Sequence, residues 1–431
     1  MKSSVGKQQN GVINVKMKKK IFLATEQFPF GNVERVFIQE EYEKLKEEYD
    51  ITIFSHSDKA SDNDTWCDKE IEVINVNTRL NILKLVKFLM LFLIDKDAWC
   101  EVSNIIKTKG KRLYKIYESF VFYARALNDW YNIRDVILSY KNQEILYYSY
   151  WYYYYTYAIT RKKNKFKKIK IITRTHGFDL YDERCRCGRQ PFKTIMDRNL
   201  DKVIFACQYA KQYYTSKINN IDFDKYIVSE IGTKSGSLNI KQQKNNVFLI
   251  VSCSSVIPLK RVNLIIDGLS IVDNCNIEWH HFGNGTEYEK IKKYAKEKLE
   301  KSKFVNYKFH GYMKNEEILQ YYSQNYINCF ITTSESEGGA PVSIQEALAF
   351  GIPVIGTKIG GITEMINGNG ILISETPSKI EVKNAIEKIS MLDNIDYIDM
   401  RKKSYELWNQ KYQAKENAKR FINILTSIWD K

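Results

Sequence analysis

One segment in the last third of the chain limits the possible folds most. From Ser334 to Glu364 it reads SESEGGAPVSIQEALAFGIPVIGTKIGGITE. A polar loop with paired glycines leads into a helix that ends at Gly351, and a short apolar strand follows. Glycines let backbone amides approach a ligand closely, and the start of a helix presents unpaired N–H groups, which suits a phosphate. Because Glu337 and Glu346 flank this loop with carboxylates that could bind sugar hydroxyls, the segment predicts a nucleotide-sugar site.

The rest of the chain predicts an α/β fold with two parallel sheets. Predicted strands of a first series are 20–24, 50–54, 145–150, 169–173 and 202–206, and those of a second series are 247–255, 277–282, 305–309, 329–332 and 354–357. Helical segments separate the strands, and this alternation is typical of parallel sheets covered on both faces. Ligands of such sheets bind at the carboxyl ends of the strands. The aromatic run 147–157 (YYSYWYYYYTY) is interpreted as a buried strand that leads into a packed helix, rather than as a platform for stacked bases.

The length of 431 residues suits two domains of roughly 200 residues each. A change in composition marks the join, because 233–246 is polar and lacks apolar periodicity. The predicted organisation lists a disordered tail at 1–18, a first domain at 19–232, the linker at 233–246, a second domain at 247–410 and a terminal helix at 411–431.

The net charge of +15 raises the question of a partner. Two segments bear on it. The segment 83–94 (LKLVKFLMLFLI) is too short to span a bilayer and is either a packed amphipathic helix or a helix that touches a membrane. The segment 161–170 holds seven basic residues in ten and is either a solvated loop or a surface for anionic lipid or a pyrophosphate-linked acceptor. No nucleic-acid partner is expected, because no nucleic-acid module surrounds these basic residues.

The N-terminal sequence lacks the apolar core of a signal peptide, and the eight cysteines follow no framework pattern. We therefore expect a cytoplasmic protein, with the inner face of the membrane as a further hypothesis. Cys185 and Cys187 have no matching second pair, so no metal site is predicted.

The segment that begins at Ser334 resembles the retaining family-4 glycosyltransferases of the GT-B fold. Their signature is a Glu, seven residues and a second Glu that opens a helix, followed by a Gly-x-Pro-Val strand and a Gly-Gly loop. Here eight residues (GGAPVSIQ) separate Glu337 from Glu346, and we place the extra residue in the loop 338–341. The resemblance implies two Rossmann-like domains that face each other across a cleft, with the terminal helix packed back on the first domain.

The resemblance also implies a donor site. The segment 251–262 (VSCSSVIPLKRV) is similar to a family loop whose Arg and Lys neutralise the donor diphosphate. Lys260 takes the place of that Lys, Ser255 stands where the family has Arg, and the adjacent Arg261 could compensate in part. The implied donor-binding residues are Gly31, Ser255, Lys260, Arg261, Gly283, Gly338, Gly339, Ala340, Pro341, Val342, Ser343 and Glu346.

On the acceptor side, 174–183 (RTHGFDLYDE) is similar to a family segment in which a His-Gly pair faces the cleft. It implies His176, Gly177, Asp179 and Tyr181 as acceptor-binding residues. Lys260, Glu337 and His176 are the implied catalytic residues. Two local alternatives stay open, since His176 could be a structural hydrogen-bonding group and Ser343-x-x-Glu346 also fits a helix capping box.

The function that follows is a hexosyltransferase-type transfer of sugar from a nucleotide-diphosphate sugar to a saccharide or lipid-linked saccharide. The resemblance implies retention of the anomeric configuration and no metal or other cofactor, and a place in polysaccharide, capsule or lipopolysaccharide synthesis. A nucleotide-sugar epimerase of similar architecture and a catalytically inactive binding partner are the alternatives. Ser255 and the changed spacing of the two glutamates are the features that keep the inactive form as an alternative.

Overall fold

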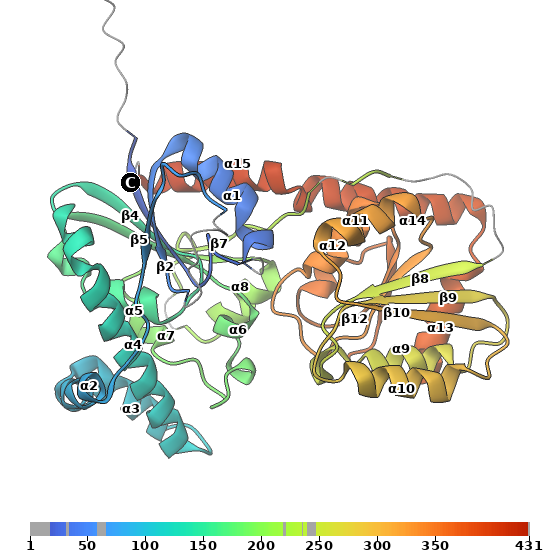
Figure 1. Ribbon diagram of the computed structural model, residues 1–431, viewed down its shortest axis with the longest axis horizontal. Coiled ribbons are helices and arrows are strands. Elements are labelled where there is room, and N and C mark those ends of the chain that lie inside the picture. Colours follow the sequence, from blue (N-terminus) through green and yellow to red (C-terminus); the bar gives the residue numbers. More distant parts are fainter. Residues whose placement is uncertain are drawn as a thin grey trace, which may run out of the picture.

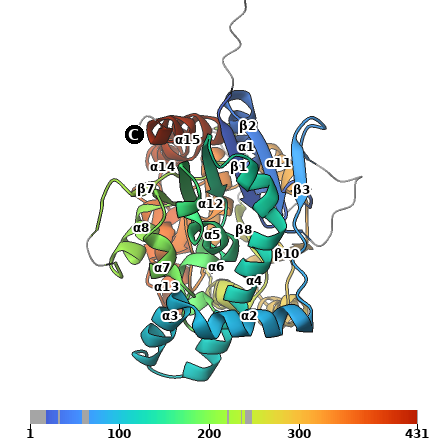
Figure 2. The same ribbon diagram turned by 90° about the vertical axis from the view of Figure 1, so that its left-hand side faces the viewer.

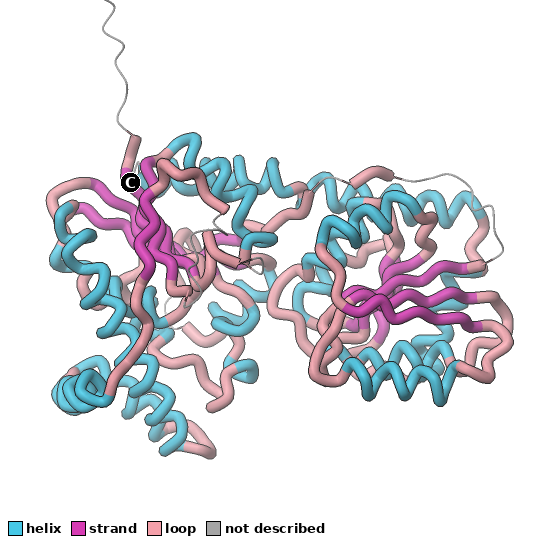
Figure 3. Tube along the Cα trace, viewed as in Figure 1, coloured by secondary structure: helices cyan, strands magenta, loops and turns pink. Residues whose placement is uncertain are grey.

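The computed structural model describes residues 18–31, 34–57, 66–218, 221–234, 236–238 and 247–429. Two parallel sheets with helices on their faces lie side by side (Figures 1 and 3), so the predicted fold class of two α/β domains is confirmed. The predicted tail and most of the predicted linker lie outside the described residues. The domain boundaries set from the sequence stay predictions.

The first sheet has the strand order β3-β2-β1-β4-β5-β6-β7, with all neighbours parallel. Its strands are β1 (Lys20–Thr25), β2 (Asp50–Ser55), β3 (Glu72–Asn75), β4 (Glu144–Ser149), β5 (Lys168–Arg174), β6 (Lys202–Phe205) and β7 (Tyr226–Val228). Every residue of β1 is buried, because helices cover both faces of the sheet. The strand order reverses between β1 and β4, which places a ligand crevice beyond the carboxyl ends of these two strands.

The helices of this domain are α1 (Arg35–Glu48), α2 (Ile82–Ile94), α3 (Lys96–Ile106), α4 (Arg112–Ser139), α5 (Tyr154–Thr160), α6 (Gly177–Leu180), α7 (Lys193–Asp197) and α8 (Gln208–Thr215). Helices α2, α3 and α4 all fall between β3 and β4, and α2 and α3 both pack against α4. The Asp95 carboxylate caps the start of α3 by accepting from the backbone N–H groups of Asp97 and Ala98. The apolar segment 83–94, which the sequence analysis interpreted as a helix, forms nearly all of α2.

The second sheet has the order β10-β9-β8-β11-β12-β13, again with parallel neighbours. Its strands are β8 (Phe248–Cys253), β9 (Ile277–Phe282), β10 (Val305–Gly311), β11 (Cys329–Thr332), β12 (Val354–Thr357) and β13 (Gly370–Ile373). Its helices are α9 (Val262–Leu269), α10 (Tyr288–Leu299), α11 (Asn315–Gln324), α12 (Val342–Ala349), α13 (Lys379–Ser390) and α14 (Asn394–Leu407). The order reverses between β8 and β11, so the second crevice lies beyond these two strands.

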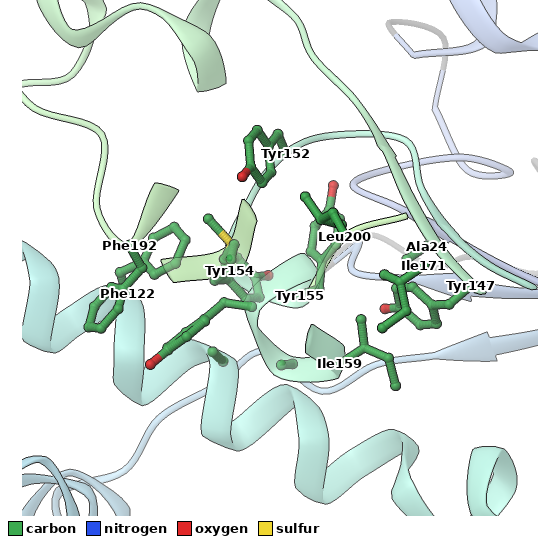
Figure 4. Close-up of a cluster of buried hydrophobic side chains, with 14 of the residues drawn as sticks. Ala24, Phe122, Tyr147, Tyr152, Tyr154, Tyr155, Ile159, Ile171, Phe192 and Leu200 are labelled. Atoms are coloured by element: carbon green, nitrogen blue, oxygen red, sulfur yellow. The ribbon is translucent and has the colours of Figure 1, made fainter. Parts of the chain in front are cut away.

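Aromatic side chains dominate the core of the first domain (Figure 4). Tyr147, on β4, and Tyr155, on α5, are both completely buried, and all of α5 is buried with them. Phe122 of α4 stacks on Phe192, with ring centroids 5.9 Å apart. The prediction of a buried strand followed by a packed helix in this aromatic run is therefore confirmed.

The chain crosses between the domains twice, and the two crossing segments contact each other near Thr233 and Gln413. The backbone of Thr233 pairs with the second crossing, donating to Tyr412 O and accepting from Ala414 N at 2.8 and 3.0 Å. The indole N–H of Trp408 also donates to Thr233 Oγ1 at 2.9 Å. After this point α15 (Ala414–Trp429) packs against α1, and its Phe421 belongs to the core of the first domain. Figure 1 shows α15 in red alongside α1.

Candidate active site

A cavity of about 620 Å³ lies between the two domains, a volume in the range of small-molecule sites. It opens where the carboxyl ends of both sheets meet. The predicted site residues that line it are His176, Gly177, Ser255, Lys260, Gly283, Glu337, Gly338, Gly339, Ala340, Pro341, Val342, Ser343 and Glu346. Gly31, Arg261, Asp179 and Tyr181 are not among its lining residues.

Lys260 and Glu337 form an ion pair within this cavity. Lys260 ends the short 3₁₀ turn η3 (Pro258–Lys260) after β8, and Glu337 lies in the loop after β11. Their side chains keep 21% and 11% of their exposure, so both can meet a ligand while they contact each other. The pair places a cation and a carboxylate at one point of the cavity wall, although 77 residues separate them in the sequence.

Arg261 does not provide the second cation that the sequence suggested. Its backbone is left-handed, with φ of +46°, and its guanidinium donates to the carbonyl oxygens of Thr333, Ser334 and Glu375 at 2.7 to 2.8 Å. These bonds tie the loop after β8 to the loop after β11, and they direct the guanidinium away from the cavity. Arg261 therefore holds the Lys260 loop beside the Glu337 loop, and its expected role at the donor is replaced by a positioning role.

Two glycines, Gly338 and Gly360, allow backbone segments to approach closely around this site. A Cβ on Gly338 would lie 2.1 Å from Gly177 Cα of the other domain, and a Cβ on Gly360 would lie 2.2 Å from Glu337 O. Neither neighbour is a flexible side chain, so any larger residue would force the backbone apart. The contact of Gly177 with Gly338 is a point where the two domains meet at the cavity.

The first turn of α12 and the buried carboxyl of Glu346 form the next part of the wall. The helix begins at Val342 after Pro341, and its first backbone N–H groups have no partners within the helix. Glu346 Oε1 accepts from Asn315 Nδ2 of α11 at 2.6 Å, so its side chain does not turn back to cap α12. The capping-box alternative is wrong, because the residue before the helix is Pro341 and makes no side-chain cap. Burial raises the pKa of Glu346 to about 7, against the lowering effect of the Asn315 hydrogen bond.

His176 comes from the loop after β5 and reaches the cavity from the first domain. Its ring packs on Trp151, with centroids 3.9 Å apart. Both ring nitrogens are buried and find no hydrogen-bond partner among the described residues. Burial, followed by the positive charge of Arg174, holds the pKa of His176 well below its usual value of 6.5, so the ring is neutral near pH 7.

Asp179 and Tyr181 are buried beside this loop and do not line the cavity. The carboxylate of Asp179 is buried and accepts from the backbone N–H groups of His176 and Tyr152 at 2.6 and 2.7 Å. Tyr181 is 2% exposed and packs on the ring of Tyr213. Both residues adjoin the loop that reaches the cavity, but their side chains are buried within the protein.

Gly31 lies in the loop between β1 and α1 and adopts a left-handed conformation, with φ of +75°. The residues of this region that line the cavity are Val36 and Phe37 of α1. The loop is organised by the buried carboxylate of Glu34, which accepts from the backbone N–H groups of Gln27 and Phe28 at 2.5 and 2.6 Å. The indole N–H of Trp151 also donates to Glu34. Gly31 therefore allows the chain to turn in this loop, whereas α1 provides the residues that line the cavity.

Several lining residues were missed by the sequence reasoning. Arg184 belongs to the first domain, yet its guanidinium donates to Ser336 O of the second domain at 2.8 Å. Its Nε has no hydrogen-bond partner among the described residues. Asn315 and Cys253 also line the cavity, and burial raises the pKa of the Cys253 thiol to about 12. Only the pattern ERCRCGR hinted at cations near residue 184, and nothing in it pointed to the cleft.

The described residues contain no group of three or more His, Cys, Asp or Glu side chains that could hold a metal ion. The cavity instead combines a lysine, helix-start amides, two carboxyl groups and a neutral histidine. Such a set can bind a phosphate and several hydroxyls together. The expectation of a reaction without metal stays a prediction.

Comparison with known proteins agrees with this arrangement. Residues 237–407 match the family of glycosyl transferases group 1. An uncharacterized glycosyltransferase of Methanocaldococcus jannaschii is 27% identical over 263 residues. That alignment covers 60% of this chain and 66% of the archaeal protein, which is just under two thirds of its length.

Solved structures of glycosyltransferases share the fold across both domains. The lipopolysaccharide outer core galactosyltransferase WaaB in its apo form superposes with a TM-score of 0.66 at 16% identity, covering 95% of this chain and 99% of WaaB. HepE of Anabaena, in complex with UDP and glucose, gives a TM-score of 0.63 at 15% identity, covering 95% and 100%. The chain has the GT-B fold. The comparisons thus show the fold of the whole chain and a match of residues 237–407 to the glycosyl transferases of group 1.

Proposed function

We propose that this chain transfers a glycosyl unit from a nucleotide-diphosphate sugar to a hydroxyl of a saccharide or lipid-linked saccharide, with retention at the anomeric carbon. The observation that carries the proposal is one cavity wall on which Lys260, the start of α12 and Glu346 lie together. A cation and helix-start amides suit a diphosphate, whereas a carboxyl group suits ribose hydroxyls. The structure of HepE with UDP and glucose makes uridine diphosphate sugars the first donors to test.

In the proposed reaction the acceptor oxygen bonds to the anomeric carbon on the face from which the diphosphate departs. The bond from that carbon to the β-phosphate oxygen breaks, and the acceptor proton leaves with the nucleoside diphosphate. Lys260 and the first amides of α12 stabilise the negative charge that grows on the diphosphate, a contribution typically worth about 3 to 4 kcal/mol for one well-placed donor. Glu337, held by Lys260, orients the hydroxyls of the donor sugar.

His176 has a role that fits its environment. Because the ring is neutral and both nitrogens lack partners among the described residues, it offers one donor and one acceptor to the transferred sugar or the acceptor hydroxyl. Leaving these buried groups unpaired costs about 1 to 3 kcal/mol each, which a bound saccharide would recover.

Arg184 supplies the second cation of the proposed donor site, since Ser255 stands where the resembling family has arginine. Its guanidinium lines the same cavity as Lys260, and its Nε has no partner among the described residues. An arginine contributed by the opposite domain would bind the diphosphate only when the domains are close together. The loss of the usual cation therefore does not require an inactive protein.

The test is turnover of nucleotide-diphosphate sugars with and without saccharide acceptors, for wild type and for Lys260→Ala. Lys379→Ala, an exposed lysine at the start of α13, is the matched control. We expect acceptor-dependent release of nucleoside diphosphate with a glycosylated product, and about a hundredfold loss in Lys260→Ala alone. Isomerised donor without acceptor would instead identify an epimerase. Donor binding without turnover in every variant would identify an inactive binding partner.

A further inference from the structure

Helix α2 presents an apolar face to solvent. Seven of its thirteen residues are large apolar side chains that are 43% to 81% exposed: Ile82, Leu83, Val86, Leu89, Met90, Leu93 and Ile94. At about 100° per residue these seven fall within an arc of about 140° on one side of the helix. The buried residues Phe88 and Phe92 lie on the opposite side, where α2 packs on α4. The exposed stripe is thus continuous and is covered by no other described part of the chain.

The position of α2 leaves this stripe accessible. Figure 2 shows the helix lying along the edge of the first domain, away from the second domain in Figure 1. Aromatic residues with polar groups border it. Trp99 of α3 is 57% exposed and donates its indole N–H to Leu93 O at 2.7 Å, and Tyr131 of α4 is 40% exposed and stacks on Phe88. Tryptophan and tyrosine are enriched at the boundary between a bilayer and water.

The charged residues of α2 are all basic. The helix contains Lys84 and Lys87 and no acidic residue. At its C-terminal end a second cavity, of about 570 Å³, is lined by the apolar residues Leu91 and Ile94 together with basic side chains. The basic side chains of that lining are Lys96, Arg134, Arg161 and Lys162. The one carboxylate among the lining residues, Asp95, is paired with Arg161.

Two of these basic residues, Arg161 and Lys162, belong to the basic segment 161–170. Lys163 and Lys168 of that segment pair with Asp201 and Glu144, so the segment is not the single solvated loop considered from the sequence. Arg161 and Lys162, at its start, face the second cavity beside α2. The apolar stripe and the positively charged cavity therefore meet at one edge of the domain.

We infer that α2 is a docking helix for an anionic phospholipid bilayer. The apolar stripe lies among the upper acyl chains, and the basic cavity binds headgroup phosphates. A helix of thirteen residues is too short to cross the hydrocarbon core, and no helix in the described ranges has the length and apolar character for a crossing. Charge complementarity selects the bilayer as occupant, because a helix with only lysines for charges is attracted to anionic lipid. The docking needs no sugar transfer, but it would bring the proposed enzyme close to a lipid-linked acceptor.

The experiment is sedimentation of the full chain with phosphatidylcholine vesicles that contain, or lack, about one third phosphatidylglycerol. The variant Ile82→Glu places a charge on the stripe at the first residue of α2, where Ile82 is 78% exposed. The matched control Ile395→Glu makes the same change at the second residue of α14 in the other domain, where Ile395 is 80% exposed. Glutamate is tolerated in the first turn of either helix, so both variants should fold.

We expect wild type and Ile395→Glu to bind anionic vesicles equally, and to bind neutral vesicles about tenfold more weakly. Ile82→Glu should lose binding to anionic vesicles by about tenfold or more. Equal binding of Ile82→Glu and wild type would overturn the inference, as would failure of wild type to bind anionic vesicles. A wild-type dimer in sedimentation velocity that becomes monomeric in Ile82→Glu, without vesicle binding, would assign the stripe to a second copy of the chain.

The docking test and the test of function can fail separately. Ile82→Glu should keep the rise in melting temperature that a nucleotide-diphosphate sugar gives to wild type, because α2 contributes no residue to the interdomain cavity. Loss of vesicle binding with donor binding retained supports docking through α2. Absence of any donor effect in wild type would count against the proposed function and leave the vesicle result standing.

Discussion

Replacing Glu346 by Gln should stabilise the protein, and the gain should grow as the pH rises. Burial raises the pKa of Glu346 from 4.5 to about 7, so the folded chain holds a proton that the unfolded chain releases. Between these values the folded state binds more protons, and stability therefore falls as the pH increases. At about 1.36 kcal/mol for each pH unit, the full effect is about 3 kcal/mol and is reached above about pH 7. Glutamine carries no charge and can still accept the hydrogen bond from Asn315 through its amide oxygen.

Urea denaturation of wild type and Glu346→Gln at several values from about pH 5 to about pH 8 measures this directly. The difference in the free energy of unfolding should be small at the acid end and approach about 3 kcal/mol at the alkaline end. Glu316→Gln, an exposed neighbour in the first turn of α11, reports the same chemical change at the surface. A difference between wild type and Glu346→Gln that stays constant with pH would refute the argument from burial.

Three further predictions test other parts of the structure. Gly338→Ala should lower kcat/KM for sugar transfer at least about tenfold, because its Cβ would lie 2.1 Å from Gly177 Cα and hold the domains apart; unchanged kinetics would contradict this contact. Arg184→Lys should weaken binding of a nucleoside diphosphate about tenfold in calorimetry, since lysine loses the paired donors of the guanidinium; equal affinity would remove Arg184 from the donor site. Phe122→Ala should lower the free energy of unfolding by about 3 to 5 kcal/mol in urea, because the ring is buried against Phe192; a loss below about 1 kcal/mol would show that the aromatic core can collapse around the gap.

The sequence predicted ten of the thirteen described strands, and it missed β3, β7 and β13, which lie at the edges of the two sheets. The expected strand at 20–24 is β1 at Lys20–Thr25, and the expected strand at 354–357 is β12. Burial on both faces of the sheet favours nearly continuous apolar runs, such as Ile21 to Ala24 of β1. The same regularity placed Lys260 and Glu337 correctly after two strands that turned out to be neighbours in the sheet.

Contacts that join distant parts of the chain could not be predicted in this way. Arg184 and Ser336 lie 152 residues apart in the sequence, and their hydrogen bond depends on how the domains are placed. The sequence also could not predict which residues of α2 are exposed to solvent. Its residues are apolar nearly all round the helix, so periodicity could not say which side faces α4 and which side faces solvent.

Local geometry also explains why Arg261 and Asp179 do not line the cavity. Both residues adjoin the correct loops, but each uses its charge on backbone groups of those loops. A flexible loop that carries a reactive side chain needs such internal bonds to hold that side chain in place. Arg261 does this for the Lys260 loop and Asp179 for the His176 loop, so a charged residue next to a site in sequence can support the site without lining it.

The loops of each half of the cavity are held by bonds within that half. Glu34 and Asp179 fix the loops of the first domain, whereas Arg261 fixes those of the second. Across the cleft, Glu364 accepts from the backbone N–H groups of Gln208 and Tyr209 at the start of α8, at 3.1 and 2.6 Å. Arg184 also donates to Ser336 O, and Gly177 approaches Gly338 closely, so the two halves contact each other beside the cavity. A site that needs Lys260 from one half and His176 from the other is complete only when the domains are together, which couples the proposed chemistry to domain closure.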